Sequence, residues 1–418
     1  MMKISMFALT LGLGLADSSM AFAAEPTTEA ILKTYADIAL AGYEDALTTA
    51  KALDAATDAL IANPSDATLT AARDAWRASR PSYQQTEAFR FGNAIVDEWE
   101  GKVNAWPLDE GLIDYVDTAS YGTESDENSL FTANVIANSK IVIDGAEVDA
   151  SEITPAFLRE KLSEAGGIES NVSTGYHAIE FLLWGQDLHG TGPGAGERPF
   201  TDYSIAEHAD RRAKYLNSAT DLLVSDLEEM VADWKEGGPA RTALAGTGLA
   251  TILTGMGSLS FGEVAGQRMK LGLLLHDPEE EHDCFSDNTY ISHLNDAIGI
   301  QNVYLGKYTR VDGSVVEGPS ISELVATKDA ALDTEIKRLL ADTVAKMEIM
   351  KTRGDTVEKY DQMIAEGNTE GNAVVQAAID GLIAQTRGVE RAVASLQLGD
   401  TVTIEQSDSL TNPDAVFQ

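Results

Sequence analysis

One apolar stretch near the middle of the chain carries a histidine and a glutamate, and it constrains the fold more than any other feature. It reads Gly-Tyr-His-Ala-Ile-Glu-Phe-Leu-Leu-Trp-Gly, from Gly175 to Gly185. In a helix, His177 and Glu180 lie on one face, because residues three apart are neighbours on the helix surface. The other side chains are apolar nearly all round, which predicts a buried helix over about residues 169–185. A buried imidazole beside a carboxylate needs a partner, which is either the other member of the pair or a bound metal ion.

The hydrophobic spacing along the rest of the chain is mostly that of amphipathic helices. Helices are predicted over about residues 28–61, 66–91 with a kink at Pro81, 154–164, 204–234, 240–256, 259–275, 288–306, 320–351, 355–366 and 371–397. Asp-Gly turns within residues 141–148 and 308–317 predict two small β-hairpins. The sequence therefore predicts an all-α protein of two up-and-down helical bundle domains with small β-hairpin insertions.

The predicted domains meet near residue 200, after a glycine-rich loop. Residues 24–200 form the first helical bundle domain, which carries His177 and Glu180, and residues 201–404 form the second. The polar segment 405–418 is expected to be a flexible tail. The two halves repeat a similar order of helices and loops, which indicates an internal duplication.

The start of the chain has the three parts of a secretory signal peptide. Lys3 precedes a short apolar stretch, and Ala21-Phe22-Ala23 forms a small-residue cleavage site. Residues 1–23 are therefore predicted to be removed, which places the protein outside the cytoplasm, in the periplasm of a Gram-negative cell. Later segments are too short or too polar to span a bilayer, so no stable membrane insertion is expected.

The strongly negative net charge of the chain restricts the classes of partner that it can bind. The chain has 67 acidic and 30 basic residues, for a formal net charge of −37. Such a charge argues against nucleic acid and anionic membranes as partners and favours the attraction of cations. Cys284 is the single cysteine, which excludes an internal disulfide and a cysteine-based zinc site.

Several stretches together resemble a known family. Gly175-x-His177-x-x-Glu180 matches the GxHxxE signature of imelysin-like proteins. The remaining stretches resemble the iron-regulated protein A branch of that family; they are Phe89-Arg90-Phe91-Gly92, residues 104–110, residues 257–263 and residues 282–288. The resemblance implies two helical bundles with a site near their junction and a role connected with iron.

The candidate metal ligands come from separate parts of the chain, as is usual for bundle sites that bind iron through carboxylates and histidine. The predicted ligands are His177, Glu180, Glu87, Asp109, Glu110, His282 and Asp287. Arg90 and Arg268 are expected to pair with the carboxylates around the metal. Iron, as Fe²⁺ or Fe³⁺, is the favoured ion, with Zn²⁺ or Mn²⁺ as alternatives. Without a metal, the loop carboxylates and His282 would be solvated surface groups.

Three functions remain open from the sequence. The favoured one is an exported protein of iron uptake, which binds iron or a small iron complex between the domains and works with envelope iron-uptake proteins. The second is a metallopeptidase, because imelysins have been labelled as peptidases. However, the chain lacks the His-Glu-x-x-His and Gly-x-Ser-x-Gly motifs, which makes an enzyme less favoured. The third is a periplasmic module that binds a peptide or protein without a metal.

Overall fold

The computed structural model describes residues 25–417, so the predicted signal peptide over residues 1–23 lies outside the described residues. The first α-helices are α1 (Thr28–Ala62), α2 (Asp66–Gln84), α3 (Ala94–Asn104), α4 (Pro155–Phe157), α5 (Gly175–Trp184) and α6 (Ala209–Trp234). The later ones are α7 (Pro239–Thr247), α8 (Leu249–Ser258), α9 (Leu271–Leu275), α10 (Thr289–Leu305), α11 (Ile321–Lys328), α12 (Ala330–Thr356), α13 (Tyr360–Ile364), α14 (Thr369–Ser395) and α15 (Asp408–Thr411). Shorter 3-10 helices and the π-helices η3 and η6 are η1 (Glu87–Phe89), η2 (Glu110–Leu112), η3 (Leu158–Leu162), η4 (Ala165–Gly167), η5 (Phe200–Tyr203), η6 (Leu259–Lys270), η7 (Pro278–Glu280), η8 (Cys284–Ser286) and η9 (Pro413–Phe417).

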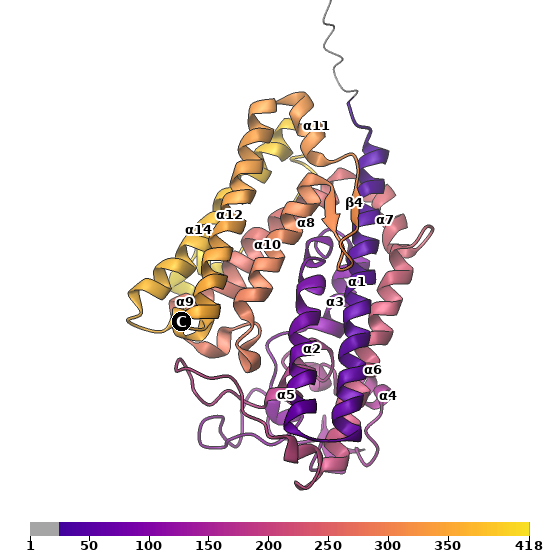
Figure 1. Cartoon of the computed structure of the whole chain (residues 1–418), viewed down its shortest axis with the longest axis vertical. Helices are drawn as coiled ribbons and strands as arrows, with labels where there is room; N and C mark the ends of the chain where they lie inside the picture. Colours follow the sequence, from indigo (N-terminus) through magenta and orange to yellow (C-terminus); the bar gives the residue numbers. More distant parts are fainter. Residues whose placement is uncertain (1–24, 418) are drawn as a thin grey trace, which may run out of the picture.

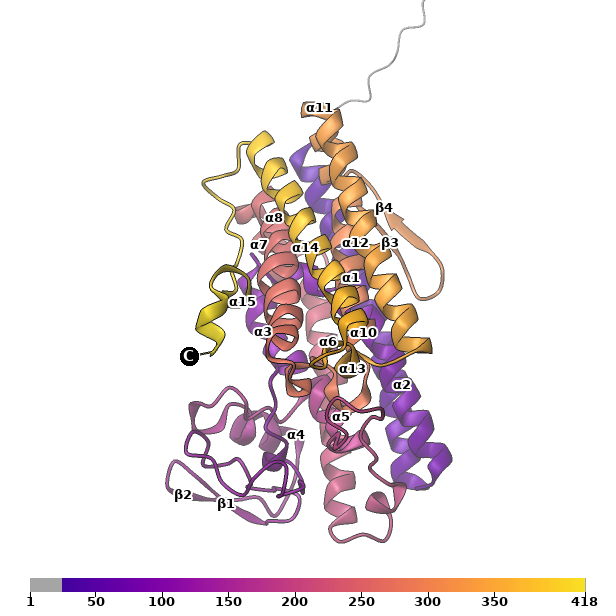
Figure 2. The same ribbon diagram turned by 90° about the vertical axis from the view of Figure 1, so that its left-hand side faces the viewer.

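Two hairpins interrupt the helices, and both were predicted from their Asp-Gly turns. Strands β1 (Lys140–Ile143) and β2 (Ala146–Asp149) pair antiparallel, with Ile141 opposite Val148. Strands β3 (Lys307–Thr309) and β4 (Val315–Glu317) pair in the same way, with Tyr308 opposite Val316. The prediction of an all-α protein with small hairpin insertions is therefore confirmed (Figure 2).

Local capping explains where the helix boundaries differ from the predicted ones. Helix α2 ends at Gln84, three residues after Pro81, instead of continuing to about residue 91, because proline removes one hydrogen bond of the helical ladder. The predicted helix over residues 320–351 is two helices, α11 and α12. Between them Asp329 accepts hydrogen bonds from the N–H groups of Ala331 and Leu332, which starts a new helix.

The long helices form two bundles that stand side by side. Helix α1 packs on α2 and α6, and α5 packs on α2, α3 and α6. In the other bundle α12 packs on α14 and α10, and α14 packs on η6, which continues α8 into α9. Figure 1 shows indigo α1 and α2 with pink α6 on one side, and orange α10 and α12 with yellow α14 on the other. The bundles meet where α10 packs on α2. There a Cβ on Gly299 would lie 2.5 Å from the Gln85 carbonyl oxygen, so the close approach requires glycine.

Two segments pack differently from their predicted domain assignment. Helix α6 follows the predicted division at residue 200 and yet packs on α1 and α5, so the division itself stays a prediction. Part of the tail that was expected to be flexible lies against η6. Ser407 and Ser409 are buried there, and the Ser409 hydroxyl donates to the Gly266 carbonyl at 2.9 Å.

The apolar segment from α7 to α9 bends sharply. Helix α7 and the continuous helix Leu249–Leu275 meet at an angle of 102°. Within residues 25–417 no single helix is long and apolar enough to cross a membrane, and this bent pair passes the same criterion only as a pair.

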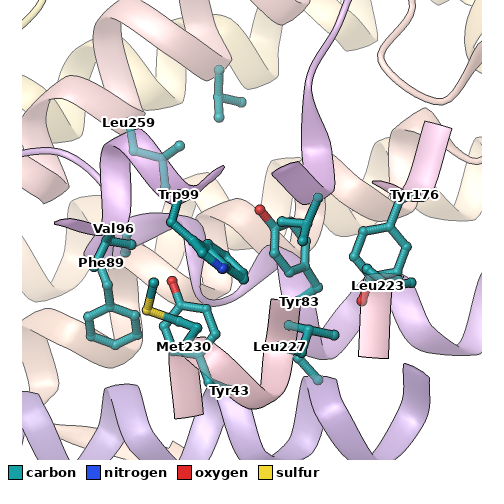
Figure 3. Close-up of a cluster of buried hydrophobic side chains, with 14 of the residues drawn as sticks. Tyr43, Tyr83, Phe89, Val96, Trp99, Tyr176, Leu223, Leu227, Met230 and Leu259 are labelled. Carbon is teal, nitrogen blue, oxygen red and sulfur yellow. The ribbon is translucent and has the colours of Figure 1, made fainter. Parts of the chain in front are cut away.

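The core of the first bundle is aromatic. Figure 3 shows Tyr43 beside Trp99, and Tyr83 between Trp99 and Tyr176. The rings of Tyr43 and Trp99 lie edge to face, with centroids 5.7 Å apart. The Tyr83 and Tyr176 centroids are 4.9 Å apart. Edge-to-face and tilted aromatic pairs stabilise a core beyond the area that they bury. Tyr83 lies on α2 and Tyr176 on α5, so this packing fixes the helix that carries His177 against α2.

Candidate metal centre

Helix α5 begins later than predicted and sits unusually close to α3. All of its residues from Gly175 to Trp184 are buried. Residues 169–174, which were expected to be helical, instead bond to other segments, as when the Thr174 hydroxyl donates to the Lys102 carbonyl. Gly175 has φ +84°, and a Cβ there would lie 2.4 Å from the Val103 carbonyl oxygen. Glycine is therefore required at the first position of the Gly-x-His-x-x-Glu motif, since only glycine fits both the conformation and the space.

His177 of α5 converges with His282 and Asp283, which lie between η7 and η8, and we call these three residues the metal trio. One ligand atom from each lies within 4.8 Å of those of the other two, and in the described part of the chain this is the single such group of histidine, cysteine or carboxylate residues. The His177 and His282 ring centroids are 4.6 Å apart. Asp283 Oδ1 lies 3.8 Å from His177 Nδ1 and 3.7 Å from His282 Nδ1. All three side chains are at most 3% exposed.

A buried arginine holds the carboxylate of the trio. Arg80 of α2 donates to Asp283 Oδ1 at 2.9 Å and to Asn104 Oδ1 at 2.9 Å. The other oxygen of Asp283 accepts from Asn288 at 3.1 Å and from the Ser292 hydroxyl. With one oxygen shared between Arg80 and the two imidazoles and the other fixed by donors, the carboxylate is held toward both histidines.

Glu180 lies beside the trio and supports it from α5. Its Oε2 is 3.2 Å from His177 Nδ1, and its Oε1 accepts the backbone N–H of Ser286 at 2.9 Å. The Ser286 bond ties α5 to the loop that carries His282 and Asp283. Glu180 therefore links His177 of α5 to the loop of His282 and Asp283. Its contact with His177 is the pairing on one helical face that was predicted from their spacing.

The protonation states suit a cation. Burial lowers the pKa of the His177 imidazole to about 3, with Arg80 adding to the effect, and burial lowers the pKa of His282 well below its usual range. Burial alone would raise the pKa of Asp283, but the Arg80 guanidinium and the hydrogen bonds from Ser292 and Asn288 outweigh it and hold that pKa below its usual value. Neutral imidazoles and an ionised carboxylate are the forms that coordinate metals. Burial and the nearby Asp283 raise the pKa of Glu180 well above its usual range.

Unpaired nitrogens and an adjacent cavity test whether a metal fits this site. His177 Nε2 and His282 Nδ1 are buried without a hydrogen-bond partner. Buried polar atoms are rarely left unpaired, so such atoms require an explanation. His282 also lines a cavity of about 570 Å³, together with Trp106, Arg268 and Glu100. Two imidazoles and a carboxylate beside an accessible cavity fit a first-row transition metal such as iron or zinc.

The other predicted ligands lie elsewhere. Glu87 accepts from Arg268 at 2.8 Å instead of facing the trio. Asp109 accepts from the Ser170 hydroxyl at 2.7 Å and holds its own loop. Glu110 lies in a separate acidic cavity, and Asp287 lines a surface cavity with Arg77. Neither a loop sequence nor, for Glu87, a predicted helix fixes whether a side chain faces a distant group, so all four residues remained candidate ligands until the fold was known.

The two predicted arginines do pair with carboxylates. Arg268 contacts Glu87, Glu263 and Asp296, at 2.8, 2.8 and 3.4 Å respectively. Arg90 contacts Glu263 at 3.5 Å, so the two arginines share this carboxylate. Their predicted role beside a bound metal remains a prediction.

Sequence reasoning missed Asp283 and Arg80. Asp283 follows His282 directly, within the stretch of residues 282–288 that carried the family resemblance. Arg80 continues the buried face of α2 that includes Ala72 and Trp76, at helical spacing. A charged residue on an otherwise apolar helix face was the available signal, because such a group must find a buried partner.

Comparison with known proteins identifies the family and the fold of the chain. The profile of the Imelysin family, which carries the label Peptidase M75, matches residues 39–389. Iron-regulated protein A of Synechococcus elongatus is 32% identical over 109 residues, which cover 24% of this chain and 31% of that protein. The match thus spans about a third of the length of this curated relative.

Two solved structures share the fold. A crystal structure described as an iron-regulated protein A precursor, from Parabacteroides distasonis, has a TM-score of 0.60 at 19% identity, and the match covers 89% of this chain and 96% of that one. An imelysin-like protein from Psychrobacter arcticum has a TM-score of 0.59 at 16% identity, with 91% and 98% covered. Because the family profile spans most of the sequence, the chain belongs to the Imelysin family.

Proposed function

We propose that this protein binds iron, as the ion or as a small complex, at the metal trio, and that it serves iron uptake outside the cytoplasm. The observation that carries the proposal is the convergence of His177, His282 and Asp283 with two buried, unpaired imidazole nitrogens. A bound cation would accept the lone pairs of those two nitrogens and balance the negative charge of Asp283. The name of the relative in Synechococcus elongatus supports iron as the ion, and the signal-like segment over residues 1–23 supports export.

The adjacent cavity supports a small complex as well as a bare ion. Its volume of about 570 Å³ falls within the range of small-molecule sites. The charged residues in its wall include two arginines, Arg90 and Arg268, and several glutamates, among them Glu100, Glu263 and Glu280. A ligand in this cavity would touch His282 directly, so an iron complex could exchange one of its ligands for the imidazole.

Anaerobic titration of the metal-stripped protein with Fe²⁺ tests the proposal. We expect one ion per chain, and we expect His177→Ala and His282→Ala each to weaken binding by at least about 100-fold, since each removes a direct ligand. His208→Asn is the matched control, because His208 is partly exposed at the start of α6 with φ +61°, a conformation that asparagine tolerates. Equal iron binding by the wild type and both alanine variants would refute the site.

A metallopeptidase is the second candidate, and one observation favours it. Catalytic zinc takes three protein ligands and keeps one open position, and the trio supplies three groups. Glu180 lies beside His177 as the nearest group that could handle a proton. If zinc-loaded protein cleaves casein and Glu180→Gln abolishes the cleavage while zinc remains bound, this candidate replaces iron uptake. Absence of cleavage with zinc bound removes it.

A further inference from the structure

A second cluster of carboxylates, of which Glu110, Glu281 and Asp361 are buried, lies on the other side of the loop that carries His282 and Asp283. We call it the acidic cavity, and its charged lining is Glu110, Asp187, Glu279, Glu281 and Asp361. No lysine or arginine is among the described residues that line it. Its free volume is about 10 Å³, which is room for a single water molecule or a single ion.

Two of these carboxylates are buried without adequate partners. Asp361 is 2% exposed and neither of its oxygens completes a hydrogen bond, and Glu281 is 1% exposed with its Oε1 unpaired. The other oxygen of Glu281 accepts from the Thr289 hydroxyl at 2.7 Å. A buried carboxylate that lacks a counter-charge costs several kcal/mol, so two such groups around one small space require either protons or a cation.

The chain separates this cavity from the metal trio by a simple alternation. The backbone at Glu281 is extended, with φ −75° and ψ 134°. Successive side chains of an extended segment point to opposite sides. Glu280 and His282 accordingly line the larger cavity beside the trio, and Glu281 lines the acidic cavity. One strip of backbone thus forms the wall between two sites of different chemistry.

We propose that the acidic cavity is a second cation site, selective for a hard divalent ion, with Ca²⁺ as its ligand. Carboxylate oxygens are hard donors, which suit Ca²⁺ and Mg²⁺ better than the softer transition metals. These oxygens are not gathered as tightly as the ligand atoms of the trio. Ca²⁺ is the better fit because it tolerates irregular geometry and completes its shell with carbonyls and water, whereas Mg²⁺ requires a near-ideal octahedron.

The electrostatics of the wall agree with this assignment. Burial and the neighbouring Glu279 raise the pKa of Glu110 to about 8. Burial, and then Asp287, raise the pKa of Asp361 to about 7, against a partial opposing effect of the Gln362 amide. Among the described residues, no lysine or arginine lines the cavity and could stabilise the ionised forms of these groups. A divalent cation supplies that charge to two carboxylates at once.

Calorimetric titration of the metal-stripped protein with Ca²⁺ at pH 7.5 tests the inference. We expect one ion per chain with a Kd of about 1 mM or tighter, the range of extracellular calcium modules. The double variant Glu281→Gln, Asp361→Asn should bind at least about tenfold more weakly. The matched control is Glu348→Gln, Asp380→Asn, which removes two exposed carboxylates on α12 and α14 and should bind like the wild type.

Hydrogen exchange places the ion on the chain. Ca²⁺ should slow amide exchange in residues 278–287 of the wild type and leave the double variant unchanged. If the double variant fails to fold by circular dichroism, Asp361→Asn alone serves in its place. Absence of Ca²⁺ binding by the wild type, or equal binding by the double variant, overturns the inference and means that these carboxylates hold protons. Preference for Zn²⁺ over Ca²⁺ also overturns it, because Cys284 is the one soft donor in the wall.

This site is independent of the proposed iron site, and the variants keep the two apart. His177→Ala, which removes a member of the trio, should still bind Ca²⁺. The double variant of Glu281 and Asp361 should still bind Fe²⁺. A variant that loses its own ion and keeps the other supports the corresponding site. A variant that still binds its own ion like the wild type shows that this site is wrong, whatever the result at the other site.

Discussion

Substitution of Gly175 by alanine should separate the two halves of the candidate metal centre. The new Cβ would lie 2.4 Å from the Val103 carbonyl oxygen, so α5 would have to withdraw from α3 by about 1 Å to reach ordinary contact. The left-handed φ of +84° costs alanine about 1–2 kcal/mol. Overpacking in a close-packed interior adds about 1–3 kcal/mol. We therefore expect a loss of about 2–5 kcal/mol in the free energy of unfolding, together with weaker iron binding because His177 moves with α5.

Urea unfolding followed by circular dichroism measures the first effect, and Fe²⁺ titration measures the second. Gly246→Ala is the matched control. Gly246 lies in α7, where a Cβ would meet nothing within 4 Å, so alanine should leave stability equal or slightly greater. A Gly175→Ala protein with the urea midpoint of the wild type would falsify the claim that close packing of α5 on α3 requires this glycine.

Three further predictions concern charge, the second hairpin and the C-terminal segment. The pKa of Glu110 is raised to about 8, so the wild type should lose stability as the pH rises from about 4.5 to 8. Glu110→Gln should not show this loss, which amounts to up to about 4 kcal/mol at pH 8 in cation-free buffer. If the urea midpoints of the wild type and of Glu110→Gln change by the same amount between pH 5 and pH 8, the prediction is wrong. Asp45 is buried on α1 and accepts hydrogen bonds from the Tyr308 hydroxyl and the Arg310 guanidinium at 2.9 Å each. Asp45→Ala should therefore lower the free energy of unfolding by about 2–3 kcal/mol and speed amide exchange in β3 and β4. Unchanged exchange in these strands would count against the prediction. Deletion of residues 405–418 uncovers η6 and should lower the thermal midpoint, whereas an unchanged midpoint would mean that the contact of Ser409 with η6 contributes no stability.

The sequence predicted the helical fold, both hairpins and the helix of His177 and Glu180 because each rests on local spacing. Apolar residues at helical intervals, Asp-Gly turns and proline act over a few residues, so a linear reading captures them. Helix ends were less accurate, as at Asp329, because a single capping side chain decides where one helix stops and the next begins.

The candidate site shows the limit of such reasoning. His177 was predicted as a metal ligand from the spacing on its own helix. His282 was predicted as a ligand because it lies in a stretch that resembles the family. The remaining assignments depended on side-chain direction across segments that are far apart in the sequence. Asp283 reaches the trio because Arg80, 203 residues earlier in the chain, donates to its Oδ1. Glu110 lines the acidic cavity instead, although it sits in one of the stretches that resemble the family, residues 104–110.

The amino-acid sequence by itself determined that this chain forms amphipathic helices around a buried histidine–glutamate pair, because periodicity and propensity are properties of neighbours. Only the tertiary structure decided which acids meet that pair and which gather in a second cavity. The physical reason is that a metal site is a convergence of groups in space. At Glu281, where the backbone is extended, a step of one residue sends a carboxylate to one cavity and the His282 imidazole to the other.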